Sequence, residues 1–260
     1  MHNCSICSSK STYAFDSNYT KVHRCTNKYC GHLFAVDSLP FQGVHHFEND
    51  SAQDFSVYEE RNDHLIEYFK KHGIIKSGDK ILDFGAGSGH ILKSMANSDL
   101  NLQITAVEYN DEYHDNLRKI GCSIFKSIEE IPKEQLFDFI IFIEVIEHLD
   151  DPLAVVSKLK QKLRSGGKLF LTTPAGNTHH PLDNATKLYT YKIPEHVQFF
   201  TEKSLKSCCA RAGFKNISYK YINALYPNKG FNSLTGKKNT LMAYYTHLRG
   251  YTMHLTYILS

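Results

Sequence analysis

Three side chains that can bind a metal ion or transfer a proton lie close together in the middle of this chain. Glu144, Glu147 and His148 are spaced so that, on a helical turn, they would project from one face. Two carboxylates and an imidazole form a mixed oxygen and nitrogen site for a divalent ion. The histidine could instead act as a general base, or the group could only cap a turn. The residues by themselves leave these three interpretations open.

Sulfur ligands gather at the N-terminus, where four of the seven cysteines fall within 30 residues. Cys4 and Cys7 have two residues between them, and Cys25 and Cys30 have four. Two such pairs are typical of a structural zinc site, in which the metal supplies folding energy to a segment too small to fold alone. We predict a zinc-ribbon-like module over residues 1–36.

Other interpretations of these cysteines remain. The wider second spacing means that a histidine could replace one thiolate, and the candidates are His2, His23 and His32. Unconnected thiols and a disulfide are further alternatives, although disulfides are rare in a reducing cytosol. The other three cysteines lie in apolar stretches and are predicted to be small core residues; they are Cys122, Cys208 and Cys209.

A glycine-rich turn follows the strand-like run I-L-D-F. Gly85, Gly87 and Gly89 occupy alternate positions, and glycine lets the backbone turn sharply and approach a ligand closely. Glu108 ends the next strand-like run, 19 residues after Gly89. A glycine turn after one strand and a carboxylate after the next are typical of a doubly wound sheet that binds an adenosine, with the carboxylate on the ribose hydroxyls.

Strand-like and helix-like segments alternate around these motifs, which specifies a parallel α/β sheet. We predict a Rossmann-like, seven-stranded sheet that ends with two C-terminal strands. Besides the two strands already described, the predicted strands are 123–125, 137–143, 168–172, 216–222 and 253–259, with a turn at 165–167; the predicted helices are 57–71, 111–120, 153–163 and 201–212, the last capped by Thr201 and ended by Gly213.

The order of these motifs resembles the class I S-adenosylmethionine-dependent methyltransferases, over roughly residues 78–174. The resemblance implies S-adenosylmethionine as the cofactor, with Asp83 holding its amino group beside the glycine turn and Glu108. It also implies that the helix at 57–71 covers the cofactor pocket. On this basis Tyr58, Tyr109 and Glu144 are further candidates for cofactor binding, although ordinary packing would explain Tyr58 equally well.

The stretch E-V-I-E-H-L-D-D-P is similar to ubiquinone-pathway O-methyltransferases. Together with T-T-P and a later histidine before F-F-T, it is also similar to the metal-dependent small-RNA 2′-O-methyltransferases. This similarity implies that Glu144, Glu147, His148 and His196 bind a catalytic divalent ion, with Mn, Mg and Fe as candidates. His148 and His196 are the candidate catalytic residues, either as ligands or as a base.

The composition indicates a cytoplasmic globular enzyme rather than a membrane protein. The net charge is only +3, and no apolar run approaches the roughly 18 residues of a membrane span. The N-terminus has no secretory signal pattern. The weak charge excess does not suggest nucleic acid as a partner. We predict a linker at 37–56 and a methyltransferase domain at 57–260, with acceptor-side insertions at 174–200 and 223–252.

A cysteine-rich N-terminus before a methyltransferase core looks like the bacterial methyltransferases that act on sugars and capsule precursors. We therefore expect O-methylation of a small anionic metabolite, such as a nucleotide-linked or phosphorylated sugar. The basic, tyrosine-rich stretch within 223–252 could attract such an acceptor, or could be a solvated helix. A sugar C-methyltransferase, an RNA 2′-O-methyltransferase and a non-catalytic module that binds S-adenosylmethionine are the alternatives.

Overall fold

The computed structural model of the chain describes residues 2–16, 20–36, 56–176, 195–219 and 254–260. Most of the predicted linker and of both predicted insertions, including the basic, tyrosine-rich stretch, lies outside these ranges. In the described part of the chain, none of the helices has the length and apolar character needed to cross a membrane.

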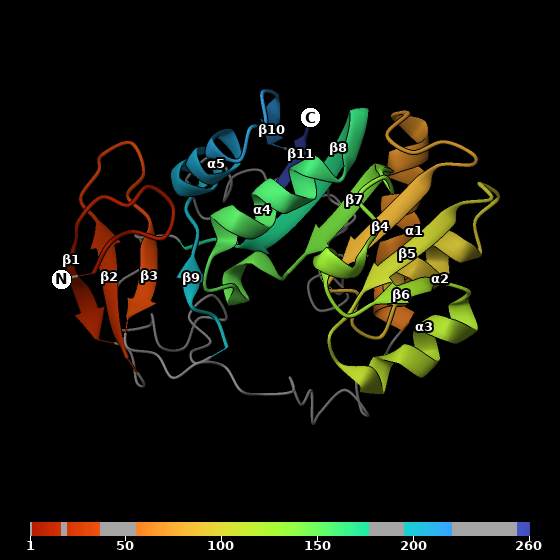
Figure 1. Cartoon of the computed structure of the whole chain (residues 1–260), viewed down its shortest axis with the longest axis horizontal. Helices are drawn as coiled ribbons and strands as arrows, with labels where there is room; N and C mark the ends of the chain where they lie inside the picture. The colour runs from red at the N-terminus through yellow and green to blue at the C-terminus, as the bar shows by residue number, and fades with distance from the viewer. Residues whose placement is uncertain (1, 17–19, 37–55, 177–194, 220–253) are drawn as a thin grey trace, which may run out of the picture.

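The centre of the molecule is a seven-stranded sheet with the order β10-β11-β8-β7-β4-β5-β6. Its five parallel strands are β4 (Lys80–Phe84), β5 (Gln103–Val107), β6 (Ser123–Phe125), β7 (Phe137–Ile143) and β8 (Leu163–Pro174). The last two strands, β11 (His254–Leu259) and β10 (Ile217–Tyr219), are antiparallel. The predicted Rossmann-like sheet is confirmed (Figure 1). The chain order reverses between β4 and β7, and ligands bind at the carboxyl edge of such a switch point.

Helices cover both faces of this sheet because each strand interior is apolar on both sides. The helices are α1 (Ser56–Lys71), α2 (His90–Ala96), α3 (His114–Ile120), α4 (Pro152–Gln161) and α5 (Glu202–Arg211). The first three pack on one face, where Phe69 of α1 meets Phe139 and Phe170 with ring centroids 5.0 Å apart. The other two pack on the opposite face.

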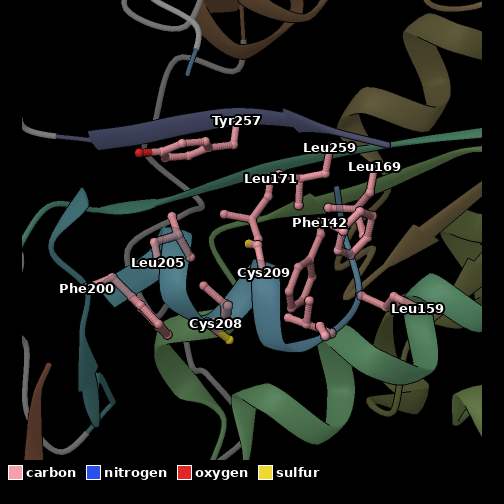
Figure 2. Packing of buried hydrophobic residues seen from close by; sticks show 14 of the residues in the cluster. Phe142, Leu159, Leu169, Leu171, Phe200, Leu205, Cys208, Cys209, Tyr257 and Leu259 are labelled. Carbon is pink, nitrogen blue, oxygen red and sulfur yellow. The ribbon is translucent and has the colours of Figure 1, made fainter. Parts of the chain in front are cut away.

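The α5 face shows why two of the cysteines are core residues. Cys208 and Cys209 are fully buried beneath β8 and β11, near Leu171 and Tyr257 (Figure 2). Cys122 is partly buried against the core on the other face. The prediction that these thiols pack as small apolar groups is confirmed.

Several predicted elements differ in extent from the structure. The helix predicted at 153–163 is α4, which ends at Gln161, and Leu163 already belongs to β8. The strand predicted at 168–172 is the longer β8, and the turn predicted at 165–167 is an irregularity within it. The pairing of β7 with β8 shifts there, from Phe137 opposite Leu163 to Phe139 opposite Lys168. The extra residues on β8 bulge out of the ladder. The helix predicted at 111–120 begins as a 3-10 turn, η2 (Asp111–Tyr113), and continues as α3.

The cysteine-rich N-terminus forms a second, antiparallel sheet of β1 (Ser11–Asp16), β2 (Lys21–Cys25) and β3 (Leu33–Val36). Its fourth strand is β9 (Gln198–Phe199), which comes from far along the chain and pairs with β3. Figure 1 shows β9 between β3 and the helices α4 and α5. The N-terminal sheet is therefore joined edge to edge with a segment that leads directly into α5.

Candidate active site

The glycine turn lies at the carboxyl end of β4 and has the shape that the sequence predicts. Gly85, Gly87 and Gly89 have φ of +79°, +53° and +82°, values that favour glycine. At Gly85 the space is also restricted, because a Cβ there would lie 2.5 Å from Cγ2 of Val145. This close approach places the turn against the segment that follows β7.

Glu108, at the end of β5, holds the turn in place. Its Oε2 accepts a hydrogen bond from Gly87 N at 2.7 Å, and its Oε1 accepts one from Asn110 N at 2.8 Å. The side chain is buried, with 5% exposed. Each carboxylate oxygen has a second lone pair for another donor, such as a ribose hydroxyl.

Asp83 is a second buried carboxylate at the same sheet edge. Burial, and then the charge of Glu108, raise the pKa of Asp83 to about 8. Within the described parts of the chain, no group donates a hydrogen bond to its carboxylate. A buried acceptor without a donor is costly unless a ligand supplies one. The cationic amino group of S-adenosylmethionine would do so, and the residues present therefore fit this cofactor.

Two other predicted cofactor residues are less defined. Tyr109 directly follows Glu108, and 58% of it is exposed. Tyr58 belongs to α1, but its side chain lies outside the described residues. Their roles in binding stay predictions.

A residue that the sequence did not single out is Asn62 of α1. It is fully buried and accepts hydrogen bonds from Arg61, while its Nδ2 has no hydrogen-bond partner among the described residues. The sequence pattern could have identified Asn62, because it shares the apolar helix face of Leu65 and Phe69. A polar side chain on an apolar face is a candidate for a functional role.

The acidic and imidazole side chains after β7 form a compact group. Ligand atoms of Glu147, His148 and His196 lie within 4.8 Å of one another. Glu147 and His196 are almost fully buried, and the rings of His148 and His196 are 4.8 Å apart. One Glu147 oxygen accepts a hydrogen bond from Thr173 Oγ1 at 2.9 Å. The other, Oε1, is buried and has no hydrogen-bond partner in the parts of the chain that the structure describes.

This group fits a divalent cation in its chemistry. Burial, and then the charge of Glu144, raise the pKa of Glu147 well above its usual range. His148 Nδ1 lies 2.8 Å from the carbonyl oxygen of Glu195, so Nδ1 carries a proton, and in the neutral ring Nε2 is then the acceptor. That Nε2 is 3.9 Å from Glu147 Oε1. A second nitrogen fixed by a carbonyl is the usual arrangement of a metal-binding histidine.

Glu144 is not part of this group, although the resemblance placed it among four ligands. The expected common helical face does not form, because only Ile146–His148 make a short 3-10 turn, η4. Glu144 lies before that turn in a left-handed conformation with φ of +53°. Its Oε1 accepts a hydrogen bond from Thr172 Oγ1 at 2.7 Å. The structure thus brings together three of the four predicted ligands.

Comparison with known proteins supports the assignment of the glycine turn as a cofactor site. The family described as "Methyltransferase domain" matches residues 54–219, which is more than half of the chain. The chain belongs to this family. The match begins just before α1 and ends with β10, and so includes the glycine turn, η4 and β9.

Curated relatives point to the same class. The methyltransferase is 34% identical over 106 residues to the ubiquinone biosynthesis O-methyltransferase of Xanthomonas oryzae pv. oryzae, an alignment that covers 37% of this chain and 44% of the relative. It is 33% identical over 105 residues to the Xanthomonas campestris pv. campestris protein of the same description. The chain therefore spans less than half the length of these relatives.

Solved structures share the fold. An S-adenosylmethionine-dependent methyltransferase from Archaeoglobus fulgidus has a TM-score of 0.53 at 15% identity, covering 80% of this chain and 99% of the other. Phosphoethanolamine N-methyltransferase 2 of Haemonchus contortus, solved with S-adenosyl-L-methionine, has a TM-score of 0.54 at 16% identity, covering 82% and 57%. At such low identity these similarities concern the fold alone. Together with the family match, they identify the methyltransferase as class I.

The four N-terminal cysteines of the methyltransferase form a second group of metal-ligand type. The Sγ atoms of Cys4 and Cys30 are 3.8 Å apart, those of Cys7 and Cys25 are 3.4 Å apart, and all four lie within 4.8 Å. Sulfurs held about 2.3 Å from one zinc ion lie about 3.8 Å apart. The described thiols are free rather than paired as disulfides. The donor set therefore fits a tetrahedral zinc ion.

The wide spacing of the second cysteine pair is accommodated by a turn. Asn27 O accepts hydrogen bonds from Cys30 N and Gly31 N, which folds Cys30 back toward Cys25. None of the three histidines offered as a replacement belongs to the sulfur group. His2 and His23 stack edge to face on each other, and His32 is bonded elsewhere.

Proposed function

We propose that this methyltransferase transfers the methyl group of S-adenosylmethionine to a hydroxyl oxygen of a small molecule, with help from a divalent ion. One observation carries the proposal: Glu147 and His148, which His196 joins from the segment before β9, follow β7 next to the glycine turn of β4. The close approach of Gly85 to Val145 brings the glycine turn against the segment that carries Glu147 and His148. A cofactor bound at the turn would have the acidic and imidazole group beside it.

The chemistry of the side chains supports this assignment. S-adenosylmethionine supplies an activated methyl group, so the protein mainly has to orient the acceptor for in-line attack. In the reaction the sulfur–methyl bond breaks, an oxygen–methyl bond forms and the hydroxyl proton leaves. Glu147 and the two histidines would hold an ion that lowers the pKa of the hydroxyl. Without an ion, Nε2 of a neutral His148 would accept the proton, because Nδ1 is held by the carbonyl of Glu195.

The oxygen acceptor also has support from the relatives described as ubiquinone biosynthesis O-methyltransferases, to which the chain is 34% identical over 106 residues. For the acceptor itself we propose a small anionic metabolite of the sugar or nucleotide-linked class used for surface polysaccharides and capsules. This choice rests on the combination of a cysteine-rich N-terminus with a methyltransferase core.

A methyl-transfer assay with labelled S-adenosylmethionine tests the proposal. The acceptor panel should contain nucleotide-linked sugars, phosphorylated sugars and catechols, with Mn²⁺, Mg²⁺ or Fe²⁺ added after treatment with EDTA. We expect turnover that needs the ion and is lost in Glu147→Gln. Full activity in EDTA would exclude a role for the metal, and a carbon–methyl bond in the product would identify a C-methyltransferase. Cofactor binding without turnover on any acceptor would favour a non-catalytic role.

We further propose that Cys4, Cys7, Cys25 and Cys30 hold one structural zinc ion. The distances between their sulfurs and the backbone N–H of Ile6 directed at Cys4 Sγ support it. The N-terminal sheet has only a small core of its own, which includes Val22, Leu33 and Phe199. A metal ion would supply stability that this core does not.

A further inference from the structure

The segment 195–200 connects the cysteine module with the active-site group. Its strand, β9, pairs with β3, and Ala35 N donates a hydrogen bond to Val197 O at 2.9 Å. On its other side Val197 N donates to Glu147 O, also at 2.9 Å. The backbone of Val197 therefore makes two hydrogen bonds: its carbonyl accepts one from the cysteine module, and its amide donates one to η4. The residue before Val197 in the sequence is His196, one of the three side chains of the active-site group.

Gln198 repeats this bridge with its side chain. Its Oε1 lies 3.0 Å from Ser5 Oγ and 2.8 Å from His32 Nε2, and both groups donate to it. Its Nε2 donates to the carbonyl oxygen of Leu149, the residue directly after η4, at 2.9 Å. One amide thus joins both cysteine pairs, through Ser5 and His32, to the turn that carries Glu147 and His148.

Burial makes this bridge specific. Gln198 is 5% exposed and His32 is fully buried. An amide oxygen only accepts, so His32 Nε2 donates to Gln198, while its Nδ1 lies 3.2 Å from Ser204 Oγ. Loss of the glutamine amide would leave the buried Nε2–H of His32 without this partner, which is costly.

The geometry of the extended segment explains how Gln198 can fix the position of His196. Side chains two residues apart in an extended segment point to the same side. His196 meets Glu147 and His148, while Gln198 binds the carbonyl that follows them. We propose that Gln198 is a positioning residue, through which the cysteine module holds His196 in register with Glu147 and His148. This inference rests on the proposed role of the three side chains as a cation site.

The test uses the full chain and the variant Gln198→Met, which keeps the side-chain length and removes the amide. We expect Mn²⁺ affinity at the active-site group to fall about ten- to 100-fold, as for other residues that orient metal ligands. S-adenosylmethionine affinity should stay unchanged, because no hydrogen bond of Gln198 reaches the glycine turn. The matched control is Gln135→Met, since Gln135 Nε2 also makes a side-chain hydrogen bond, to Thr105 Oγ1 of β5, outside the active-site group. It should leave Mn²⁺ affinity unchanged.

Ser5→Ala provides a second variant that cannot act directly on the cation site. It removes one donor to Gln198 from within the cysteine module, so its smaller effect on Mn²⁺ affinity should disappear in the Gln198→Met background. Such non-additivity is the signature of a shared contact. Additive effects, or wild-type Mn²⁺ affinity in Gln198→Met, would overturn the inference.

A readout without metal separates this inference from the proposed function. In ¹⁵N-histidine spectra, Gln198→Met should shift or broaden the ring signals of His148 and His196, whereas Gln135→Met should not. If the wild type binds no Mn²⁺ at this group, the metal-assisted function fails. The histidine spectra then still decide the positioning role. Unchanged histidine signals in Gln198→Met would refute it.

Discussion

Two buried carboxylates, Asp83 and Glu108, lie at the carboxyl ends of the neighbouring strands β4 and β5 but have different surroundings. Glu108 accepts backbone hydrogen bonds on both oxygens. Asp83 accepts none from the described residues, and its pKa is raised to about 8. The difference indicates that Glu108 shapes the glycine turn before a ligand arrives. We expect Asp83 to gain its hydrogen-bond donor from the ligand.

The raised pKa of Asp83 predicts how cofactor affinity depends on pH. Below about 8 the carboxyl is mostly protonated in the free protein, and the ligand ammonium must displace that proton. Affinity should therefore rise about tenfold per pH unit from roughly pH 6 to 7 and level off near the pKa. Calorimetric titration with S-adenosylmethionine measures this. Asp83→Asn should bind weakly and without that slope; an unchanged slope in the variant would assign it to another group.

At Gly85 both the backbone and the packing exclude a side chain. Gly85→Ala would place a Cβ against the branched Val145 side chain in addition to the positive φ, so we expect a loss of about 2–4 kcal/mol in the free energy of unfolding. Gly121→Ala is the control, because Gly121 has φ of +88° but nothing within 4 Å of the added Cβ. It should cost only about 1 kcal/mol. Urea unfolding compares them, and equal losses would contradict the predicted clash.

At the scale of elements, η4 and β9 together form the active-site group. The short turn η4 presents Glu147 and His148, and the segment leading into β9 adds His196. Three interactions join the two segments: His148 Nδ1 with Glu195 O, Val197 N with Glu147 O, and Gln198 Nε2 with Leu149 O. Neither segment forms the group without the other.

The cysteine module allows a direct test of its metal. Cys4→Ser should reduce bound zinc from about one ion per chain to near zero and lower the melting temperature, because the module depends on the ion for stability. Cys122→Ser, a change to a partly buried cysteine outside the group, should keep its zinc. Elemental analysis of the purified variants gives the answer. A Cys4→Ser protein that retains full zinc would show that the ion lies elsewhere.

At the scale of the whole molecule, the N-terminal sheet and the methyltransferase sheet are joined by contacts between residues far apart in sequence. Leu33 pairs with Phe199, and His32 contacts both Gln198 and Ser204. His32 also packs against Phe200, with ring centroids 4.7 Å apart. The contacts are mostly buried, so the two sheets share part of one core.

This shared core predicts one cooperative unfolding transition. Scanning calorimetry of the zinc-loaded protein should show a single peak, with the calorimetric and van't Hoff enthalpies equal. Addition of S-adenosylmethionine should shift the whole peak upward, because the ligand stabilises only the folded state. Two separate peaks, of which only one responds to the cofactor, would show that the cysteine module unfolds as an independent unit.

Elements whose signals are local could be predicted from the sequence. The strand predicted at 123–125 is β6, and the helix predicted at 201–212 is α5, with Thr201 accepting a hydrogen bond from Ser204 N as its cap. Such features depend on neighbouring residues and on apolar periodicity. The glycine turn and Glu108 also follow from local spacing. The irregularity in β8 does not, because it depends on the register with β7.

The sequence by itself therefore determined the fold class, the cofactor turn and the two groups of possible metal ligands, because these depend on residue type, spacing and periodicity. Only the tertiary structure decided which of the predicted ligands lie close together. Glu144, three residues from Glu147, bonds Thr172 instead, whereas His196, 48 residues from His148, joins the group. The reason is physical: the left-handed backbone at Glu144 separates near neighbours, and the pairing of β9 with β3 brings a distant segment to η4.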